Sequence, residues 1–199
     1  MSARSHKSSN SKVTIMFGPR RKAYEIPRSY LLDQHWLIPN VNYYDSSLDE
    51  EIGHILVHYV HTGEYHTPMI DETAPARIRG WMEIRIAIQV LLATEYWIMP
   101  GLRGIARAHI QSLTESINIC DLVEIVDTEL SKPSLPRIPN SRQWLYNHLS
   151  KALENAFQKD KGIFDELMEF NNFEDISLYK MLTKSMVRIM DRRIFRAAL

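Results

Sequence analysis

The sequence predicts an α+β protein, with a small sheet near the N-terminus and a largely helical second half. Apolar residues alternate over Val13–Phe17 and again over Lys22–Ile26, with the period of two that is typical of half-buried strands. From Ser46 onward, apolar residues recur at spacings of three and four, which is the period of a helix that buries one face. This change of period predicts where the sheet ends and the helices begin.

The first predicted element is a hairpin. Gly18 and Pro19 lie between the two alternating segments, and such residues favour a tight turn. Pro27 should end the second strand, because proline has no amide proton to donate. A short helix is expected over residues 28–34. Further short strands are expected over 40–44 and, at an edge, over 64–67.

The next segment predicts an amphipathic helix. Ser47 is expected to cap it, with Glu50 three residues later as the partner in a capping box. Gly63 should end it, because glycine readily adopts the left-handed conformation found after helices. The residues of its buried face follow at helical spacing: Ile52, Ile55, Leu56 and Tyr59.

Six further helices are expected. The most apolar, Trp81–Trp97, is hydrophobic nearly all round, which indicates a central helix packed on several sides. A polar loop over 68–79 should precede it, and Pro100 should break it. A helix from Leu102 to Leu113 follows, and Asn118 should cap the next one. The last predicted helices cover 144–157, 163–168 and 175–199.

These elements divide the chain into four parts. Residues 1–12 are polar and predict a flexible tail, and residues 13–130 form the mixed α+β domain. Prolines 133, 136 and 139 mark a linker over 131–140. Residues 141–199 then form an all-helical C-terminal extension.

Composition excludes several classes of protein. Lysine plus arginine and aspartate plus glutamate number 24 each, so no overall positive charge favours nucleic acid or an anionic membrane. Cys120 is the single cysteine, which favours a reducing compartment. Residues 1–12 lack the apolar segment of a signal peptide, and polar residues interrupt Trp81–Met99 too often for a membrane span. We therefore expect an intracellular protein, in the nucleus or cytoplasm.

Several motifs together resemble the BTB/POZ domain, and specifically its fungal type. Ile55–Tyr65 is similar to the helix end "LVxYLYTGxY" of that family. Val13–Ile26 resembles its opening strands, Ala93–Leu102 resembles "A-x-x-Y-x-L-x-x-L", and Ala106–Ile110 resembles "A-x-x-x-I". Trp144–Leu149 resembles the helix that often follows in fungal members. The order and spacing of these motifs carry the resemblance.

The resemblance implies a BTB/POZ-like small sheet with a helical core and a non-enzymatic role as a protein-interaction adaptor. Its partner would be another protein or a second copy of the chain, in a chromatin, transcription or ubiquitin-ligase complex. We expect no cofactor, no small-molecule substrate and no membrane.

A metal-dependent enzyme is one alternative. His54 and His58 lie four residues apart on the predicted helix, a spacing that zinc sites use, and His61 follows three residues later. The metalloprotease motif requires a glutamate directly after its first histidine, but Ile55 follows His54. No cysteine is near these histidines either. These histidines are otherwise expected to flank the buried face and meet solvent.

Two further kinds of chemistry involve Cys120 and the arginines near the C-terminus. Cys120 is expected at a helix N-terminus, but the adjacent Asp121 opposes the thiolate, and no catalytic or phosphate-binding glycine motif occurs. A nucleic-acid binder is the other alternative, through a group of arginines near the C-terminus. These are Arg188, Arg192, Arg193 and Arg196.

The candidate partner-binding residues lie on the last predicted helix. Their apolar stripe covers more than three turns, and exposed patches of that size are rare on monomers. The alternative is that this stripe packs on residues 144–157 of the same chain. The stripe consists of Leu178, Met181, Leu182, Met186, Ile189 and Met190.

Overall fold

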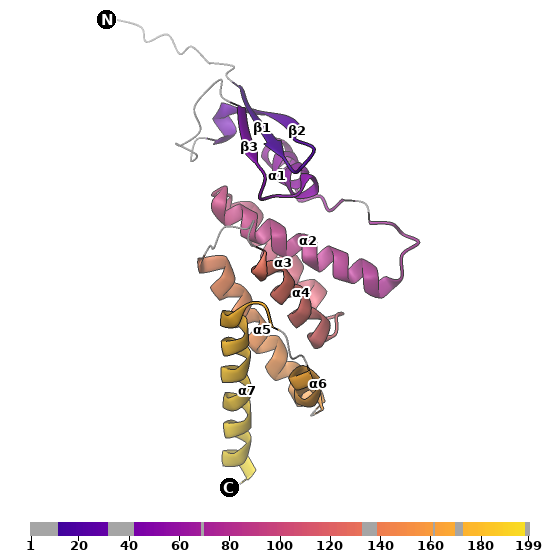
Figure 1. Ribbon diagram of the computed structural model, residues 1–199, viewed down its shortest axis with the longest axis vertical. Coiled ribbons are helices and arrows are strands. Elements are labelled where there is room, and N and C mark those ends of the chain that lie inside the picture. Colours follow the sequence, from indigo (N-terminus) through magenta and orange to yellow (C-terminus); the bar gives the residue numbers. More distant parts are fainter. Residues whose placement is uncertain are drawn as a thin grey trace, which may run out of the picture. The chain divides into compact units, whose positions relative to one another are not determined.

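Figure 1 shows the computed structural model of the chain, which describes residues 12–31, 42–68, 70–132, 139–160, 162–169 and 173–197. They fall into two compact units, which divide between His66 and Thr67. The first unit holds a three-stranded sheet and helix α1, and the second holds helices α2 to α7. The predicted mixed, mostly helical α+β class is therefore confirmed. Most of the predicted tail and the linker residues 133–138 lie outside the described residues.

The sheet has the order β2-β1-β3, with β1 (Lys12–Phe17) in its centre. β2 (Lys22–Pro27) pairs antiparallel to β1, as the predicted hairpin requires, and β3 (Asn42–Asp45) pairs parallel to β1. At the hairpin turn, Gly18 has a φ of 70° and its carbonyl accepts the N–H of Arg21 at 3.1 Å. A 3-10 turn, η1 (Arg28–Leu31), replaces the expected short helix, whose last residues lie outside the described range.

Helix α1 (Glu50–Thr62) packs against β1 and β2. Gly63 ends the helix as predicted, with a φ of 76° and its N–H bonded to the Tyr59 carbonyl at 2.8 Å. The predicted cap is wrong, because Asp49 precedes the helix and Ser47 bonds instead to the Asp45 carboxylate. The predicted edge strand over residues 64–67 is also wrong, because this segment has no regular structure.

Gly53 sets the close approach between α1 and the central strand. It is buried in α1, and a Cβ atom built on it would lie 2.3 Å from Cγ and 2.7 Å from Cβ of Phe17. Phe17 is itself fully buried, so its ring has little room to move. Glycine is therefore the residue that allows this packing distance.

The second unit is built around α2 (Ala76–Tyr96), which packs against α3 (Pro100–Thr114), α4 (Ile119–Ser131) and α5 (Pro139–Lys159). Every residue from Ile86 to Thr94 is buried, which confirms the expected central helix. The boundaries differ from the prediction. The helix includes the end of the expected loop over 68–79, and Pro100 begins α3 instead of only ending α2.

The last helices complete the second unit. α5 packs against α4, α6 (Ile163–Glu169) and α7 (Ile176–Ala197) (Figure 1). Its N-terminus is fastened to α2, because the Glu95 carboxylate accepts the backbone N–H of Ser141 at 2.6 Å and of Asn140 at 3.3 Å. Asn118 caps α4 as predicted and accepts the N–H of Cys120 at 2.7 Å. Among the described residues, no helix is long and apolar enough to cross a bilayer.

We predict that Gly53→Ala destabilises the protein although alanine favours helices. The added methyl group collides with Phe17, and overpacking of a core costs about 1–3 kcal/mol. The matched control is Gly104→Ala in α3, where a Cβ meets no atom within 4 Å, and it should stabilise by roughly 0.5–1 kcal/mol. Urea unfolding of both variants measures the difference. Equal effects of the two changes would show that α1 and β1 are not in close contact.

A second prediction concerns acid. Burial raises the pKa of Glu95, but the hydrogen bonds from Ser141 and Asn140 outweigh it and lower the pKa below its ordinary 4.5. A lowered folded-state pKa means that this carboxylate stabilises the fold above pH 4.5 and loses that effect as pH falls through the lowered pKa. The difference in Tm between wild type and Glu95→Gln should therefore shrink from about pH 6 to about pH 3. A Tm difference that stays constant over this pH range would contradict a stabilising role of the Glu95 carboxylate at the N-terminus of α5.

Candidate interaction surface

The N-terminus of α7 is held by two acidic residues, of which Asp127 is buried and Asp175 is half-buried. Asp175 caps the helix by accepting the N–H of Leu178 at 2.8 Å. Asp127 of α4 accepts the N–H of Glu174 and of Asp175, both at 2.9 Å. These bonds satisfy backbone amides that a helix N-terminus leaves without partners. α4 therefore determines where α7 begins.

Arg142 of α5 completes this connection. Its guanidinium donates to the Asp175 carboxylate at 2.8 Å and to the Leu130 carbonyl at 2.6 Å. Tyr146, one turn further along α5, donates to the same carboxylate at 3.3 Å. We call Asp127, Arg142 and Asp175 the polar hub. It joins α4, α5 and α7 through side chains that are mostly buried.

Most of the predicted partner-binding residues of α7 face α5 of the same chain. Three of the six are buried, two are half-buried, and Met190 is exposed. This is the intrachain packing that the sequence left open as the alternative. Ser150 of α5 also hydrogen-bonds to Ser185 of α7 at 2.8 Å across the same contact. The buried residues are Leu178, Leu182 and Ile189, and the half-buried ones are Met181 and Met186.

The opposite face of α7 carries a second apolar stripe, of which only Met190 was among the predicted partner-binding residues. Its large side chains are 51–68% exposed. The hydroxyl of Thr183 bonds to the Tyr179 carbonyl at 3.0 Å, so its polar group is satisfied within the helix. The sequence does contain the pattern of this stripe, because its residues follow one another at spacings of three, four, four and three positions, as on one face of a helix. We call Ile176, Tyr179, Thr183, Val187 and Met190 the outer stripe.

A row of cations runs beside the outer stripe. Lys180, Lys184 and Arg188 recur every four residues, and all three are exposed. None of them forms an ion pair with another described residue. We call these residues the basic row. Arg188 belongs to the predicted nucleic-acid group, whose other three side chains lie outside the described residues.

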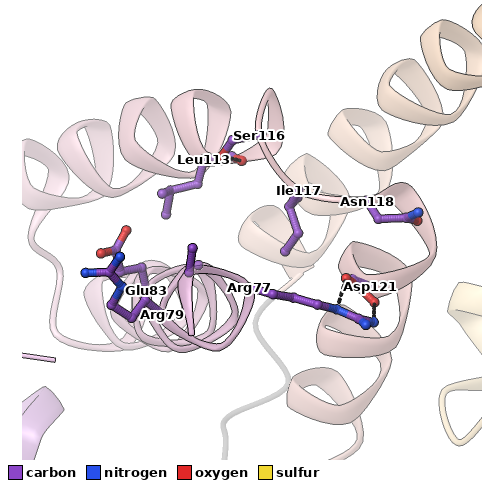
Figure 2. A pocket seen from close by; sticks show the side chains of 10 residues that line it. Arg77, Arg79, Glu83, Leu113, Ser116, Ile117, Asn118 and Asp121 are labelled. Carbon is purple, nitrogen blue, oxygen red and sulfur yellow. Dashed lines mark hydrogen bonds and ion pairs between the residues drawn. The ribbon is translucent and has the colours of Figure 1, made fainter. Parts of the chain in front are cut away.

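A pocket of about 740 Å³ lies among α2, the end of α3 and the start of α4 (Figure 2). Leu113 and Ile117 project into it, and Arg77 reaches across to Asp121 with bonds of 2.6 and 3.0 Å. These two charges neutralise each other. The Ser116 hydroxyl donates to the Leu113 carbonyl at 2.9 Å, so it is engaged within the chain. The lining contains no histidine or cysteine that could act as a base or nucleophile.

An apolar groove of about 470 Å³ lies on another side of the same turns of α2. Ile78 and Met82 are exposed there, and Trp81 is half-buried with its indole N–H unbonded. The flanking arginines are engaged, Arg77 with Asp121 and Arg85 with Glu129 at 3.2 Å. The groove offers apolar area without free charge.

The histidines of α1 form a loose cluster. The ring centroids of His54 and His58 are 6.4 Å apart, those of His58 and His66 are 5.5 Å apart, and His61 meets the Tyr30 ring instead. Burial lowers the pKa of His54, and the positive charges of Lys22 and the neighbouring histidines lower it further. In the part of the chain that the structure describes, no group of three potential ligands could hold a metal ion.

Cys120 has the environment of an unreactive thiol. Burial raises its pKa to about 11, and the carboxylates of Glu166 and Asp121 add to this shift. The sulfur lies 3.5 Å from Oε2 of Glu166. Because the thiolate is the nucleophilic form, this environment disfavours nucleophilic catalysis at neutral pH.

The fold and these surfaces define a two-part α+β protein with a small sheet unit and a helical unit. Comparison with known protein families finds two adjoining matches. Residues 26–117 match the HAC6 N-terminal domain, and residues 118–198 match the HAC6 small helical domain. The chain is thus similar to HAC6 over two adjoining segments that together extend from residue 26 to residue 198.

Two curated relatives support this similarity. They are subtelomeric hrmA-associated cluster proteins from the Aspergillus fumigatus strains CEA10 and Af293. Each is 30% identical over 139 residues, which are 70% of this chain and 32% of the relative. The chain therefore spans about a third of the length of the curated relatives it matches. No solved structure matches the chain.

These matches correct the BTB/POZ resemblance, which was wrong. The segments that suggested it, including Val13–Ile26 and Ile55–Tyr65, combine a hairpin with an apolar helix that ends at glycine. Such local patterns arise in many folds from the same turn and capping chemistry. The domain division at residues 131–140 stays a prediction. The matched segments meet at residue 117, and the compact units divide at residue 66.

The polar hub yields a stability prediction. Removing one partner of a buried ion pair leaves an uncompensated charge, so Asp175→Ala and Arg142→Ala should each cost about 3–5 kcal/mol. Both side chains are less than a fifth exposed. The double variant should cost clearly less than the sum of the two single changes. Additive losses in urea unfolding would show that the two residues act independently.

Proposed function

We propose that this chain is a non-enzymatic protein-interaction adaptor that binds another protein through the outer stripe of α7. The observation that carries this proposal is the stripe itself. Four large apolar side chains, at positions 176, 179, 187 and 190, are more than half exposed along one face of one helix. Extended apolar patches on soluble domains are characteristic of interaction sites.

The energetics of the stripe favour docking. Full burial of a large apolar side chain contributes about 1.5–3 kcal/mol, so covering the exposed half of each of these four contributes roughly 1 kcal/mol apiece. The polar hub and the inner-face packing hold α7 in place, which reduces the entropy lost on binding. A preorganised helix with such a face is suited to recognise a protein segment.

The partner is defined here by chemistry alone. Cullins and transcription factors were suggested by the BTB/POZ resemblance, which the HAC6 matches overturn. An intracellular location, in the nucleus or cytoplasm, belongs to the proposal. The α2 groove could provide a second contact, but its flanking charges are neutralised within the chain. The outer stripe has both apolar area and free charge beside it, and we therefore prefer it.

The proposal is tested by replacing two members of the stripe, Tyr179→Gln and Val187→Gln, in one variant. The control is Ile105→Gln, which changes an exposed apolar residue of α3 in the same way. Substitutions at exposed positions are expected to change stability by about 0.5 kcal/mol or less. Thermal unfolding verifies that all three proteins are folded.

Each protein is immobilised and exposed to an extract of the source organism, and retained proteins are quantified by mass spectrometry. We expect at least one protein to be retained by wild type and control and to fall about ten-fold on the double variant, a loss of about 1.4 kcal/mol. Retention of the same proteins by all three baits would contradict the proposal. Retention of no protein by the wild type would contradict it as well.

A further inference from the structure

We infer that the segment that docks on the outer stripe is an amphipathic helix with an acidic edge. This inference rests on the proposed function and adds the chemistry of the partner. It follows from the shape of the stripe, from the free cations of the basic row, and from the side of the stripe on which that row lies.

The shape of the stripe favours a helical partner. Its members recur about once per turn from residue 176 to residue 190, which corresponds to about 21 Å along the helix axis. A second helix with apolar residues at the same three-and-four spacing would place its side chains between those of the stripe. A partner strand would lack the backbone pairing that strand addition requires, because the backbone groups of α7 are bonded within the helix.

The charges favour an acidic partner. Lys180, Lys184 and Arg188 recur along one edge of the stripe, and none of them forms an ion pair with a described residue, although Asp191 follows Arg188 by three positions. The other edge adjoins the inner face of α7, which packs against α5. A helix lying on the stripe therefore meets three cations along one side. In paired helices, positions beside the apolar seam carry the charges that select the partner.

A second copy of the chain fits this surface less well. Two copies of α7 packed antiparallel around a twofold axis would bring one basic row against the other, because equivalent flanking positions face each other in antiparallel pairs. Like charges in such pairs are destabilising. Nucleic acid would satisfy the cations but would leave the apolar side chains of Ile176 and Val187 without an apolar contact. An acidic amphipathic helix matches both features.

Two synthetic peptides test the inference with the full chain. Both have three heptads with leucine and isoleucine at the seam, and they carry either glutamate or lysine at the flanking positions. Fluorescence anisotropy should show the glutamate peptide binding about ten-fold or more tightly than the lysine peptide, because each exposed ion pair contributes a few-fold. This advantage should shrink as salt rises from about 50 to about 500 mM, because salt screens exposed charges.

Charge reversal provides the matched control. Lys180→Glu, Lys184→Glu and Arg188→Glu in one variant should reverse the preference to the lysine peptide. The control changes the net charge equally at exposed sites elsewhere, through Arg28→Glu, Lys151→Glu and Lys159→Glu, and should keep the preference for glutamate. Reversal by both variants would show that net charge, and not the basic row, governs binding.

The outcomes separate this inference from the proposed function. Equal binding of the two peptides, or binding of neither, overturns the inference. The extract experiment with Tyr179→Gln and Val187→Gln still judges the proposed function independently. Sedimentation velocity tests whether a second copy of the chain occupies the outer stripe. A wild-type dimer that becomes monomeric in that double variant would identify a second copy as the occupant and would also overturn the acidic helix.

Discussion

Asp127, Arg142 and Asp175 bring three charged groups into a largely buried position where α4, α5 and α7 meet. Buried charges are costly unless each has a partner, and here every group has more than one. Asp127 accepts two backbone amides, Asp175 accepts from Arg142 and from the α7 backbone, and Arg142 also reaches the Leu130 carbonyl. Because these bonds are directional, they determine the start of α7 and how the helix is rotated. That rotation determines which of its two apolar stripes faces solvent.

The same requirement applies elsewhere in the helical unit. Glu129 is fully buried in α4 and is compensated by Gln89 at 2.8 Å, Arg85 at 3.2 Å and Lys132 at 2.6 Å. Glu95 binds the N-terminal amides of α5. The central helix α2 thus combines an apolar surface with polar groups that select particular neighbours. Apolar packing alone is tolerant of sliding, whereas these hydrogen bonds specify one arrangement.

The BTB/POZ resemblance failed for a physical reason. Its strongest segment joins an apolar helix face to a glycine C-cap, and the structure confirms both features around Gly63. Each feature reports only local backbone chemistry, which unrelated folds share. The helices that pack beside α2, and the charges that select them, distinguish one helical unit from another. Those are long-range contacts, such as the one between Arg142 and Asp175, and a local motif does not encode them.

The sequence by itself determined the elements: the hairpin, the central helix, the Asn118 cap and the terminal helix follow from period and capping residues that act within a few positions. It missed the start of α2 at Ala76 and the cap of α1, where propensity differs little between adjacent residues. The sequence did not determine the orientation of α7, because the predicted stripe over residues 178–190 and the outer stripe over residues 176–190 both have helical period and share Met190. Only the tertiary structure selected between them, since the polar hub and the α5 contact bury one stripe and leave the other exposed.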